Sequence, residues 1–345
     1  MSGRQAGDRA RRARLEGCAP SVFVHEMLDP SGASLSWLEG KGVQVTRGRP
    51  TWEGKFFSED ELVARSQGFP ALMGASTHKI TRRVMEALPD LAFVSKYGIG
   101  VDSIEMAAAN DLGILVTNTP VPENWEAVAE YTIAAMLALK KQLLFYTADR
   151  IKSGGWRTET KWSTFMRGNT IGLVGLGRIA RSVALRLSGW DCQIIACDPY
   201  VSASDAHSLG IELVSLQDLL KRSDVVSLHC LLTAETKHMI DARALRMMKE
   251  SAVLINSARG GLVDMDALDS ALAEGRVAGT AMDSYEDEPP TVGHPIFERA
   301  NVIATPHTSA WIEETYDAIA RAGALNIHAA LLGDTPPFPV NLEVL

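Results

Sequence analysis

The sequence predicts an α/β fold in which parallel strands are joined by crossover helices. From position 22 onward, short apolar runs alternate with longer stretches of helical periodicity, the pattern that successive βαβ units produce. Pro120 and Pro122 interrupt this pattern and mark a domain boundary. The chain has 345 residues, which is enough for about two domains.

Each expected strand is bounded by Gly, Pro, Asp or Asn, which favour turns. In the first block the expected strands are 21–24, 42–45, 71–74, 91–94 and 113–116. In the second block they are 170–174, 193–197, 225–228, 252–255, 279–282 and 302–304. Helical periodicity predicts long helices over 123–144 and 313–332.

Composition narrows the class of protein. Hydrophobic residues make up 46% and charged residues 22% of the chain, as in ordinary globular proteins. The net charge is −8, so we expect no nucleic-acid partner. No run approaches the ~18 apolar residues of a membrane span, so we expect no membrane association. The four cysteines form no C-x-x-C pair, which favours a reducing, cytoplasmic location, and the Arg-rich residues 1–17 are expected to be a disordered tail.

A glycine-rich turn directly follows the expected strand 170–174. Residues 175–180 read Gly-Leu-Gly-Arg-Ile-Ala and precede a helical run, which fits the G-x-G-x-x-A turn of dinucleotide-binding proteins. Gly175 permits the tight turn, Gly177 lets the backbone approach a pyrophosphate, and the small Ala180 allows helix and strand to pack closely. The expected contacts to the cofactor from this turn are Gly175, Gly177, Arg178 and Ile179.

An acidic residue ends the next expected strand. Asp198 stands 23 positions after Gly175, near the ~20 expected of a carboxylate that accepts the ribose hydroxyls. A 2′-phosphate would be repelled there, so Asp198 favours NAD as the cofactor. The alternative is a surface Asp-Pro turn.

Three later strands are followed by ionisable side chains. Arg259 follows 252–255, Glu288 follows 279–282, and His307 follows 302–304. Because ligands of open α/β sheets bind beyond the carboxyl ends of the strands, we expect these groups to converge on the cofactor. Taken singly, each could be a surface ion pair or a solvated loop residue.

These motifs together resemble the D-isomer-specific 2-hydroxyacid dehydrogenases, and the phosphoglycerate dehydrogenase-like branch is the most similar. The resemblance rests on 173–179, 256–264, Glu288-Pro289 and 305–307, and it extends from about position 22 to the end of the chain. It implies a Rossmann coenzyme domain, 121–308, inserted into a flavodoxin-like substrate domain formed by 18–120 and 309–345. Both domains would be doubly wound parallel sheets.

The resemblance also implies roles for the strand-end residues. Arg259 would grip the substrate's carboxylate, and His307 would be the general acid for reduction and the base for oxidation. Glu288 would hydrogen-bond the imidazole and fix its tautomer. Asp283 matches the acid that binds the nicotinamide carboxamide, although it could instead cap a strand end.

Further matches concern the cofactor and the substrate. His229 lies in a loop that resembles the family's adenine-side loop, and Ala258 lies in the arginine motif; both are expected to contact the cofactor. The expected substrate contacts are Ser76, Ile99, Gly100, Asn124 and Arg259. A turn residue is the safer interpretation of Ser76, and Asn124 could equally be a helix cap. The histidines form no metal-ligand spacing, so no metal is expected.

The predicted function is hydride transfer between NAD(H) and a small anionic 2-keto or 2-D-hydroxy acid. The resemblance implies a homodimer made mainly by the coenzyme domain. Two alternatives remain: a dehydrogenase of another small anion such as phosphite, and an NAD(H)-gated binding protein, because the family includes co-repressors that keep the same three residues.

Overall fold

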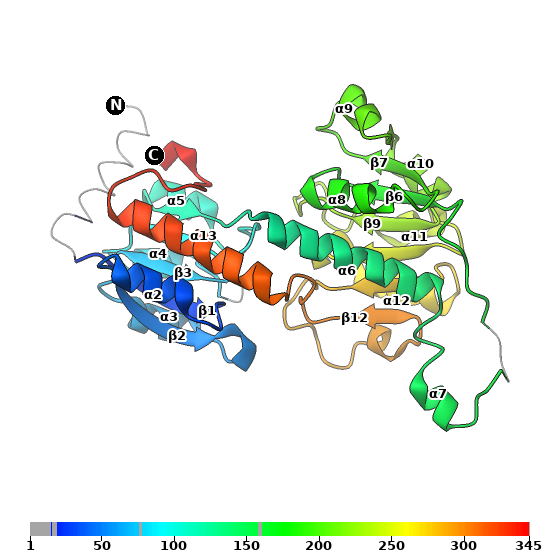
Figure 1. Cartoon of the computed structure of the whole chain (residues 1–345), viewed down its shortest axis with the longest axis horizontal. Coiled ribbons are helices and arrows are strands. Elements are labelled where there is room, and N and C mark those ends of the chain that lie inside the picture. The colour runs from blue at the N-terminus through cyan, green and yellow to red at the C-terminus, as the bar shows by residue number, and fades with distance from the viewer. Residues whose placement is uncertain (1–14, 16–18, 76–77, 158–160, 345) are drawn as a thin grey trace. The chain divides into compact units, whose positions relative to one another are not determined.

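The chain forms two compact units (Figure 1). The computed structural model describes residues 15, 19–75, 78–157 and 161–344. Unit 1 comprises Met1–Asn124 and Trp311–Leu345, and unit 2 comprises Trp125–Ala310. Unit 2 is thus inserted into the sequence of unit 1. The tail expected over 1–17 lies, apart from Leu15, outside the described residues.

Unit 1 contains a five-stranded parallel sheet in the order β2-β1-β3-β4-β5. The order 2-1-3-4-5 is that of flavodoxin-like doubly wound sheets. Its strands are β1 (Ser21–Met27), β2 (Gln44–Pro50), β3 (Ala71–Gly74), β4 (Phe93–Lys96) and β5 (Leu115–Thr117). Its helices are α2 (Ala33–Gly40), α3 (Glu59–Ser66), α4 (Arg82–Glu86), α5 (Met106–Asp111) and α13 (Glu313–Leu331). Helix α13 lies beside α2, so the end of the chain completes the first unit (Figure 1).

Both faces of the unit 1 sheet are covered. Val22 and Val24 of β1 pack into the apolar cluster that includes α13 residues, whereas Phe23 between them packs into the cluster on the other face. Successive side chains of a strand point to opposite faces, so a sheet with helices on both sides needs a continuous apolar run. This is why 21–24 could be recognised as a strand.

Unit 2 contains a seven-stranded parallel sheet in the order β12-β11-β10-β9-β6-β7-β8. Read from β8, this is the 3-2-1-4-5-6 order of the Rossmann fold with one strand added. The strands are β6 (Thr170–Val174), β7 (Gln193–Cys197), β8 (Glu212–Leu213), β9 (Val225–Leu228), β10 (Val253–Asn256), β11 (Gly279–Met282) and β12 (Val302–Ala304). The helices are α6 (Pro122–Lys140), α7 (Ala148–Lys152), α8 (Arg178–Leu187), α9 (Ala203–Ser208), α10 (Leu216–Arg222), α11 (Ala242–Met247) and α12 (Met265–Ala273).

The expected fold class, two doubly wound parallel sheets, is confirmed. Several expectations about elements are wrong. The strands expected over 42–45, 91–94 and 113–116 begin at Gln44, Phe93 and Leu115, two residues later than predicted. The two-residue strand β8 was missed, because two residues carry no periodicity. The long helix expected over 123–144 ends at Lys140. There Gln142 adopts a left-handed conformation with φ 57°, and Gln142 and Leu143 donate backbone hydrogen bonds to Leu139 and Ala138, a Schellman C-cap.

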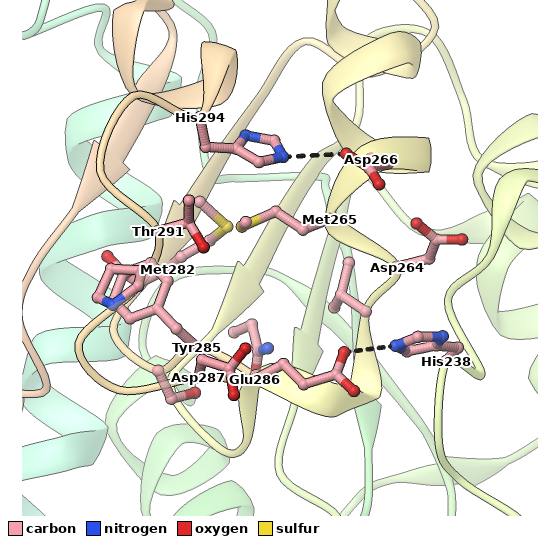
Figure 2. A pocket seen from close by; sticks show the side chains of 15 residues that line it. His238, Asp264, Met265, Asp266, Met282, Tyr285, Glu286, Asp287, Thr291 and His294 are labelled. Atoms are coloured by element: carbon pink, nitrogen blue, oxygen red, sulfur yellow. Dashed lines mark hydrogen bonds and ion pairs between the residues drawn. The ribbon is translucent and has the colours of Figure 1, made fainter.

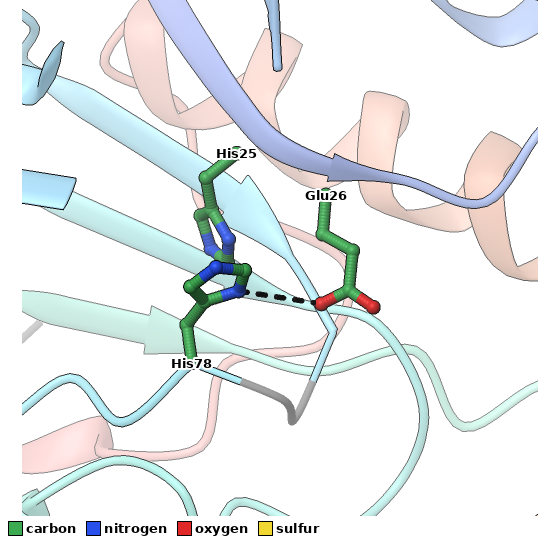
Figure 3. Close-up of side chains that lie close together, drawn as sticks. All are labelled: His25, Glu26 and His78. Carbon is green, nitrogen blue, oxygen red and sulfur yellow. Dashed lines mark ion pairs between the residues drawn. The ribbon is translucent and has the colours of Figure 1, made fainter. Parts of the chain in front are cut away.

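A polar cluster lies inside unit 1 at the carboxyl ends of β1 and β3 (Figure 3). His25, Glu26 and His78 are all buried and offer nitrogen or oxygen atoms within 4.8 Å of one another. The Phe57 amide donates to Nε2 of His78 at 2.9 Å, so Nδ1 carries the proton and faces Glu26 at 3.5 Å. The bond from Phe57 and the ion-pair contact with Glu26 orient the His78 ring inside the unit.

His25 shapes the neighbouring strand. A Cβ on Gly74 would lie 2.0 Å from Cε1 of His25, so β3 must end in glycine for the imidazole to lie over its backbone. Burial lowers the pKa of His25 from 6.5 to about 3. The ring is therefore neutral in the folded chain under conditions in which an unfolded chain would protonate it.

We expect this histidine to make stability depend on pH. Between its two pKa values, 6.5 unfolded and about 3 folded, the unfolded state binds more protons. The stability that comes from keeping His25 neutral in the folded chain is therefore present in full above pH 6.5, and the free energy of unfolding falls as the pH drops toward 3. His25→Gln should flatten the slope of the unfolding free energy against pH, measured by urea denaturation between about pH 4.5 and 7.5. Replacement of the exposed His207 by Gln is the control, and equal slopes for His25→Gln and the parent would contradict the assignment.

Candidate active site

The glycine-rich turn connects β6 to α8 in unit 2. Gly175 adopts φ +91°, and a Cβ there would lie 2.8 Å from the backbone nitrogen of Cys230, so only glycine fits. Gly177 is the N-cap of α8, and a Cβ on it would meet nothing within 4 Å. No side chain caps this helix, and no acidic residue lies in its first turn. Open space in front of a helix N-terminus is a suitable site for a phosphate anion.

Asp198 lies beside this turn, as the sequence predicts for the ribose-binding acid. Its Oδ2 accepts a 2.7 Å hydrogen bond from the Leu176 amide, and its Oδ1 accepts a 2.8 Å bond from the Tyr200 amide. These bonds fix the carboxylate next to the glycine turn. Arg178, the first residue of α8, lies with its guanidinium 5.1 Å from the centre of the Trp125 ring.

His229 follows β9 on the other side of the same turn. Burial lowers the pKa of His229 to about 4, so its ring is neutral. Nε2 lies 2.9 Å from the Ser227 hydroxyl, while Nδ1 is buried and has no partner among the described residues. A buried nitrogen of this kind is costly unless a ligand completes its hydrogen bonding. The glycine turn, Asp198 and His229 together fit a dinucleotide.

Glu288 and His307 form the central contact of the candidate site. Nδ1 of His307 lies 2.8 Å and 3.0 Å from the two carboxylate oxygens of Glu288. An ionised carboxylate only accepts, so Nδ1 carries a proton and Nε2 is left to exchange a proton with another molecule. His307 has φ +54°, a conformation that is uncommon for residues other than glycine.

Several groups act on the Glu288 carboxyl. Burial alone would raise its pKa, but the hydrogen bond and charge of His307, the Tyr285 amide and the charge of Arg259 lower it overall. Glu288 is therefore a carboxylate at neutral pH. Arg259 follows β10 and donates from Nη1 to the Ala258 carbonyl at 2.8 Å. The structure thus brings the three predicted catalytic residues to one edge of the unit 2 sheet.

Asp283 forms a clamp at this edge. It is 1% exposed, and its carboxylate accepts hydrogen bonds from the Thr305 hydroxyl at 2.6 Å, the Thr308 amide at 2.8 Å and the Ser309 amide at 2.9 Å. These partners stand on both sides of His307 in the chain. These bonds are those of a strand-end cap, which is one of the two roles expected of Asp283 from the sequence. Its contact with a nicotinamide carboxamide stays a prediction.

The expected substrate contacts other than Arg259 belong to unit 1. Ser76 lies outside the described residues. Ile99 and Gly100 lie in the loop after β4, where the Ile99 carbonyl accepts from the Asn118 side chain at 2.7 Å. Asn124 lies in the first turn of α6, and its amide donates to the Val121 carbonyl. Their contact with a substrate stays a prediction.

Two features were not predicted. Lys96 is a buried cation at the end of β4, and its Nζ lies 3.6 Å from the position that a Cβ on Gly98 would occupy. A lysine inside an apolar strand was the signal that could have revealed it. In unit 2, a cavity of about 220 Å³ lies between the loops that follow β10 and β11 (Figure 2).

The cavity is lined by acidic residues and two histidines. Figure 2 shows Nε2 of His238 directed to Glu286, at 2.8 Å, and Nε2 of His294 directed to Asp266, at 3.1 Å. None of the predicted catalytic or cofactor-binding residues lines it. The acid–imidazole contact of Glu288 and His307 therefore lies outside this cavity.

Comparisons with known proteins agree with this geometry. Residues 133–309 match the family model described as the D-isomer specific 2-hydroxyacid dehydrogenase NAD-binding domain. The chain is 38% identical over 335 residues to glyoxylate reductase of Thermofilum pendens, covering 94% of this chain and 96% of that protein. It is 38% identical over 330 residues to D-3-phosphoglycerate dehydrogenase of Mycobacterium tuberculosis, covering 94% of this chain but only 59% of the relative. The crystal structure of the TT0316 protein of Thermus thermophilus superposes with a TM-score of 0.84 at 33% identity, covering 93% and 99% of the two chains.

A Rossmann sheet with this turn, this acid and a paired imidazole defines an NAD-dependent oxidoreductase. The chain belongs to the D-isomer specific 2-hydroxyacid dehydrogenase family. The resemblance recognised in the sequence is thereby confirmed. No helix in the described part of the chain has both the length and the apolar character that a membrane span requires.

Gly177→Ala should weaken cofactor binding without unfolding the protein. Its Cβ would enter the open space before α8, where nothing else lies within 4 Å. We expect the Kd for NADH, measured by fluorescence titration, to rise about tenfold or more, while Tm changes by less than about 2 °C. Gly189→Ala is the matched control, because a Cβ there also meets nothing within 4 Å. Unchanged NADH affinity in Gly177→Ala would remove the turn from the cofactor site.

Proposed function

We propose that the protein transfers a hydride between NAD(H) and a small 2-keto or 2-D-hydroxy acid. The observation that carries this proposal is the contact of His307 Nδ1 with the Glu288 carboxylate at 2.8 Å, beside Arg259 at the carboxyl edge of a dinucleotide-binding sheet. NADH, when bound, supplies the hydride for reduction, and NAD accepts it in the reverse direction. Small unbranched acids such as glyoxylate and hydroxypyruvate are the first substrates to test, since one close relative is named a glyoxylate reductase.

Arg259, His307 and Glu288 each have a separate role in this proposal. The Arg259 guanidinium binds the carboxylate of the keto acid through two parallel hydrogen bonds and polarises the neighbouring carbonyl. Protonated His307 donates the proton on Nε2 to the carbonyl oxygen as C2 receives the hydride, and in oxidation the neutral ring removes it. Glu288 holds Nδ1–H throughout and stabilises the imidazolium by its negative charge, so the ring keeps one orientation in both protonation states.

Ile99, Gly100, Asn124 and Ser76 remain proposed contacts to the substrate. Asp198 is proposed to accept the ribose hydroxyls, and His229, Ala258, Arg178 and Ile179 to contact other parts of the cofactor. The open space at Gly177 and the partnerless Nδ1 of His229 support this assignment.

We also propose that the protein is a homodimer. The segment between α6 and β6 carries large apolar side chains that lie in solvent in the single chain, with Trp156 68% exposed and Trp162 84% exposed. Phe165 and Ile151 of the same segment are also mostly exposed. Exposed apolar groups gathered on one segment are typical of a protein–protein contact, and a second copy of the chain is the partner the family implies.

Replacing His307 by Gln tests the proposed chemistry. Loss of the general acid should lower kcat for NADH oxidation by about 10²- to 10⁴-fold, with the Kd for NADH nearly unchanged. The acceptors to be screened are glyoxylate, hydroxypyruvate, pyruvate and phosphonopyruvate, with phosphite and NAD in the reverse direction. His207→Gln, an exposed histidine of the same unit, is the control.

The outcomes of that assay separate the candidate functions. Turnover of a keto acid that is unaffected in His307→Gln would remove this residue from the mechanism. NADH binding without turnover of any acceptor would favour the NAD(H)-gated binding protein. Activity with phosphite alone would favour the other small-anion dehydrogenase.

Trp162→Ser should weaken the proposed dimer. Removing a large apolar side chain from a contact surface costs binding free energy, whereas the same change in the free monomer exposes nothing new. We expect size-exclusion chromatography with light scattering to report two chains per particle for the parent and a shift toward one chain for the variant at micromolar concentration. Val292→Ser, at a 97% exposed position outside this segment, should keep the parent's mass. A parent that already runs as one chain would contradict the proposal.

A further inference from the structure

Helix α6 reaches the strand-end segment that carries His307. Tyr131, in the middle of this helix, lies with its hydroxyl 2.7 Å from the hydroxyl of Thr305, which follows β12. The two residues are 174 positions apart in the sequence but belong to the same unit. Neither the motifs nor the family resemblance assigns a role to Tyr131.

The direction of this hydrogen bond follows from the next one in the chain. Thr305 donates its hydroxyl proton to Oδ1 of Asp283 at 2.6 Å, because a carboxylate has no proton to give. The oxygen of Thr305 can therefore only accept from Tyr131. The result is a directed chain from the Tyr131 hydroxyl through the Thr305 hydroxyl to the Asp283 carboxylate, and each bond polarises the next.

Asp283 connects this chain of hydrogen bonds to the backbone around His307. It accepts the amides of Thr308 and Ser309, the two residues that follow His307, while Thr305 lies two residues before it. The carbonyl of Thr305 also accepts the Tyr285 hydroxyl at 3.1 Å. His307 thus lies between two anchored points, which is what its φ of +54° requires, since a histidine keeps such a conformation only when its surroundings impose it.

We propose that Tyr131 is a positioning residue that holds the segment 305–309, and through it His307, in the geometry needed for proton transfer. The inference rests on the proposed role of His307 as the acid/base. Tyr131 is half-buried, and burial raises the pKa of its phenol, so the hydroxyl keeps its proton at neutral pH and remains a donor. It acts on the reaction by orienting His307.

The primary test is Tyr131→Phe, which removes one hydroxyl and leaves the ring. We expect kcat to fall about 5- to 10-fold while the KM of the keto acid and the Kd of NADH stay within about twofold, because small misplacements of a catalytic group affect the chemical step. Tyr146→Phe is the matched control: it removes a phenol that donates a 2.7 Å hydrogen bond to the Lys161 carbonyl, away from 305–309. Equal kcat values in Tyr131→Phe and the parent would overturn the proposal.

A double-mutant comparison tests the route. Thr305→Val breaks the chain at its middle, so adding Tyr131→Phe to Thr305→Val should lower kcat by less than twofold further. Thr305→Ser keeps a hydroxyl and should restore most of the activity lost in Thr305→Val. A full additional 5- to 10-fold loss in the double variant would show that Tyr131 acts by another route and would overturn the proposal.

A measurement without turnover separates this inference from the proposed function. Amide hydrogen exchange of the peptide spanning 305–309 should be faster in Tyr131→Phe than in the parent and in Tyr146→Phe. If His307→Gln proves fully active, the acid/base role fails, yet the exchange experiment still reports whether Tyr131 holds the segment. Unchanged exchange would overturn the positioning role whatever the enzyme's reaction is.

Discussion

The parallel direction of the strands in unit 2 is the constraint on which the candidate active site depends. Because all seven strands run the same way, their carboxyl ends meet at one edge, and residues separated by more than a hundred positions become neighbours. The glycine turn follows β6, Asp198 follows β7, and His229 follows β9. Arg259, Glu288 and His307 follow β10, β11 and β12 in the same way. The proximity of these residues is thus a consequence of the parallel strand pairing, and the loops need only carry the reactive side chains.

Electrostatic balance then decides what these groups can do. Burial of the Glu288 carboxylate costs desolvation free energy, and this cost is offset by His307, the Tyr285 amide and the charge of Arg259. Its negative charge fixes the proton on Nδ1 of His307 and leaves Nε2 for exchange. The N-terminus of α8 adds positive potential at the glycine turn, because no side chain caps it and no acidic residue lies in its first turn. One edge therefore combines an anion-binding backbone with an acid/base pair.

Sequence reasoning recovered the features that depend on local pattern. Strands β6, β7, β9, β11 and β12 were predicted with their observed bounds, since each is a short apolar run between turn residues. Strand β4 was placed two residues too early, because the buried Ser95 and Lys96 do not look like strand core. The end of α6 was missed because a left-handed Gln142, rather than a glycine or proline, forms the cap. Tyr131 and the buried cluster of His25 and His78 could not be found, since their partners are distant in the sequence and no spacing rule connects them.

Helix α6 gives the site a common support. Trp125 contacts the guanidinium of Arg178 beside the glycine turn, and Thr132, seven residues later, lies with its hydroxyl 3.1 Å from that of Ser257, two residues before Arg259. Seven residues are nearly two helical turns, so Trp125 and Thr132 share one face of the helix, and Tyr131 lies about 100° around the helix from Thr132. On a neighbouring face, Glu126 accepts from the Ser182 hydroxyl of α8 at 3.0 Å. A single rigid element thus contacts the segments that carry the proposed cofactor-binding arginine, substrate-binding arginine and acid/base histidine. Because the boundary between the two units falls in the first turn of α6, the helix from Trp125 onward and all three segments belong to unit 2.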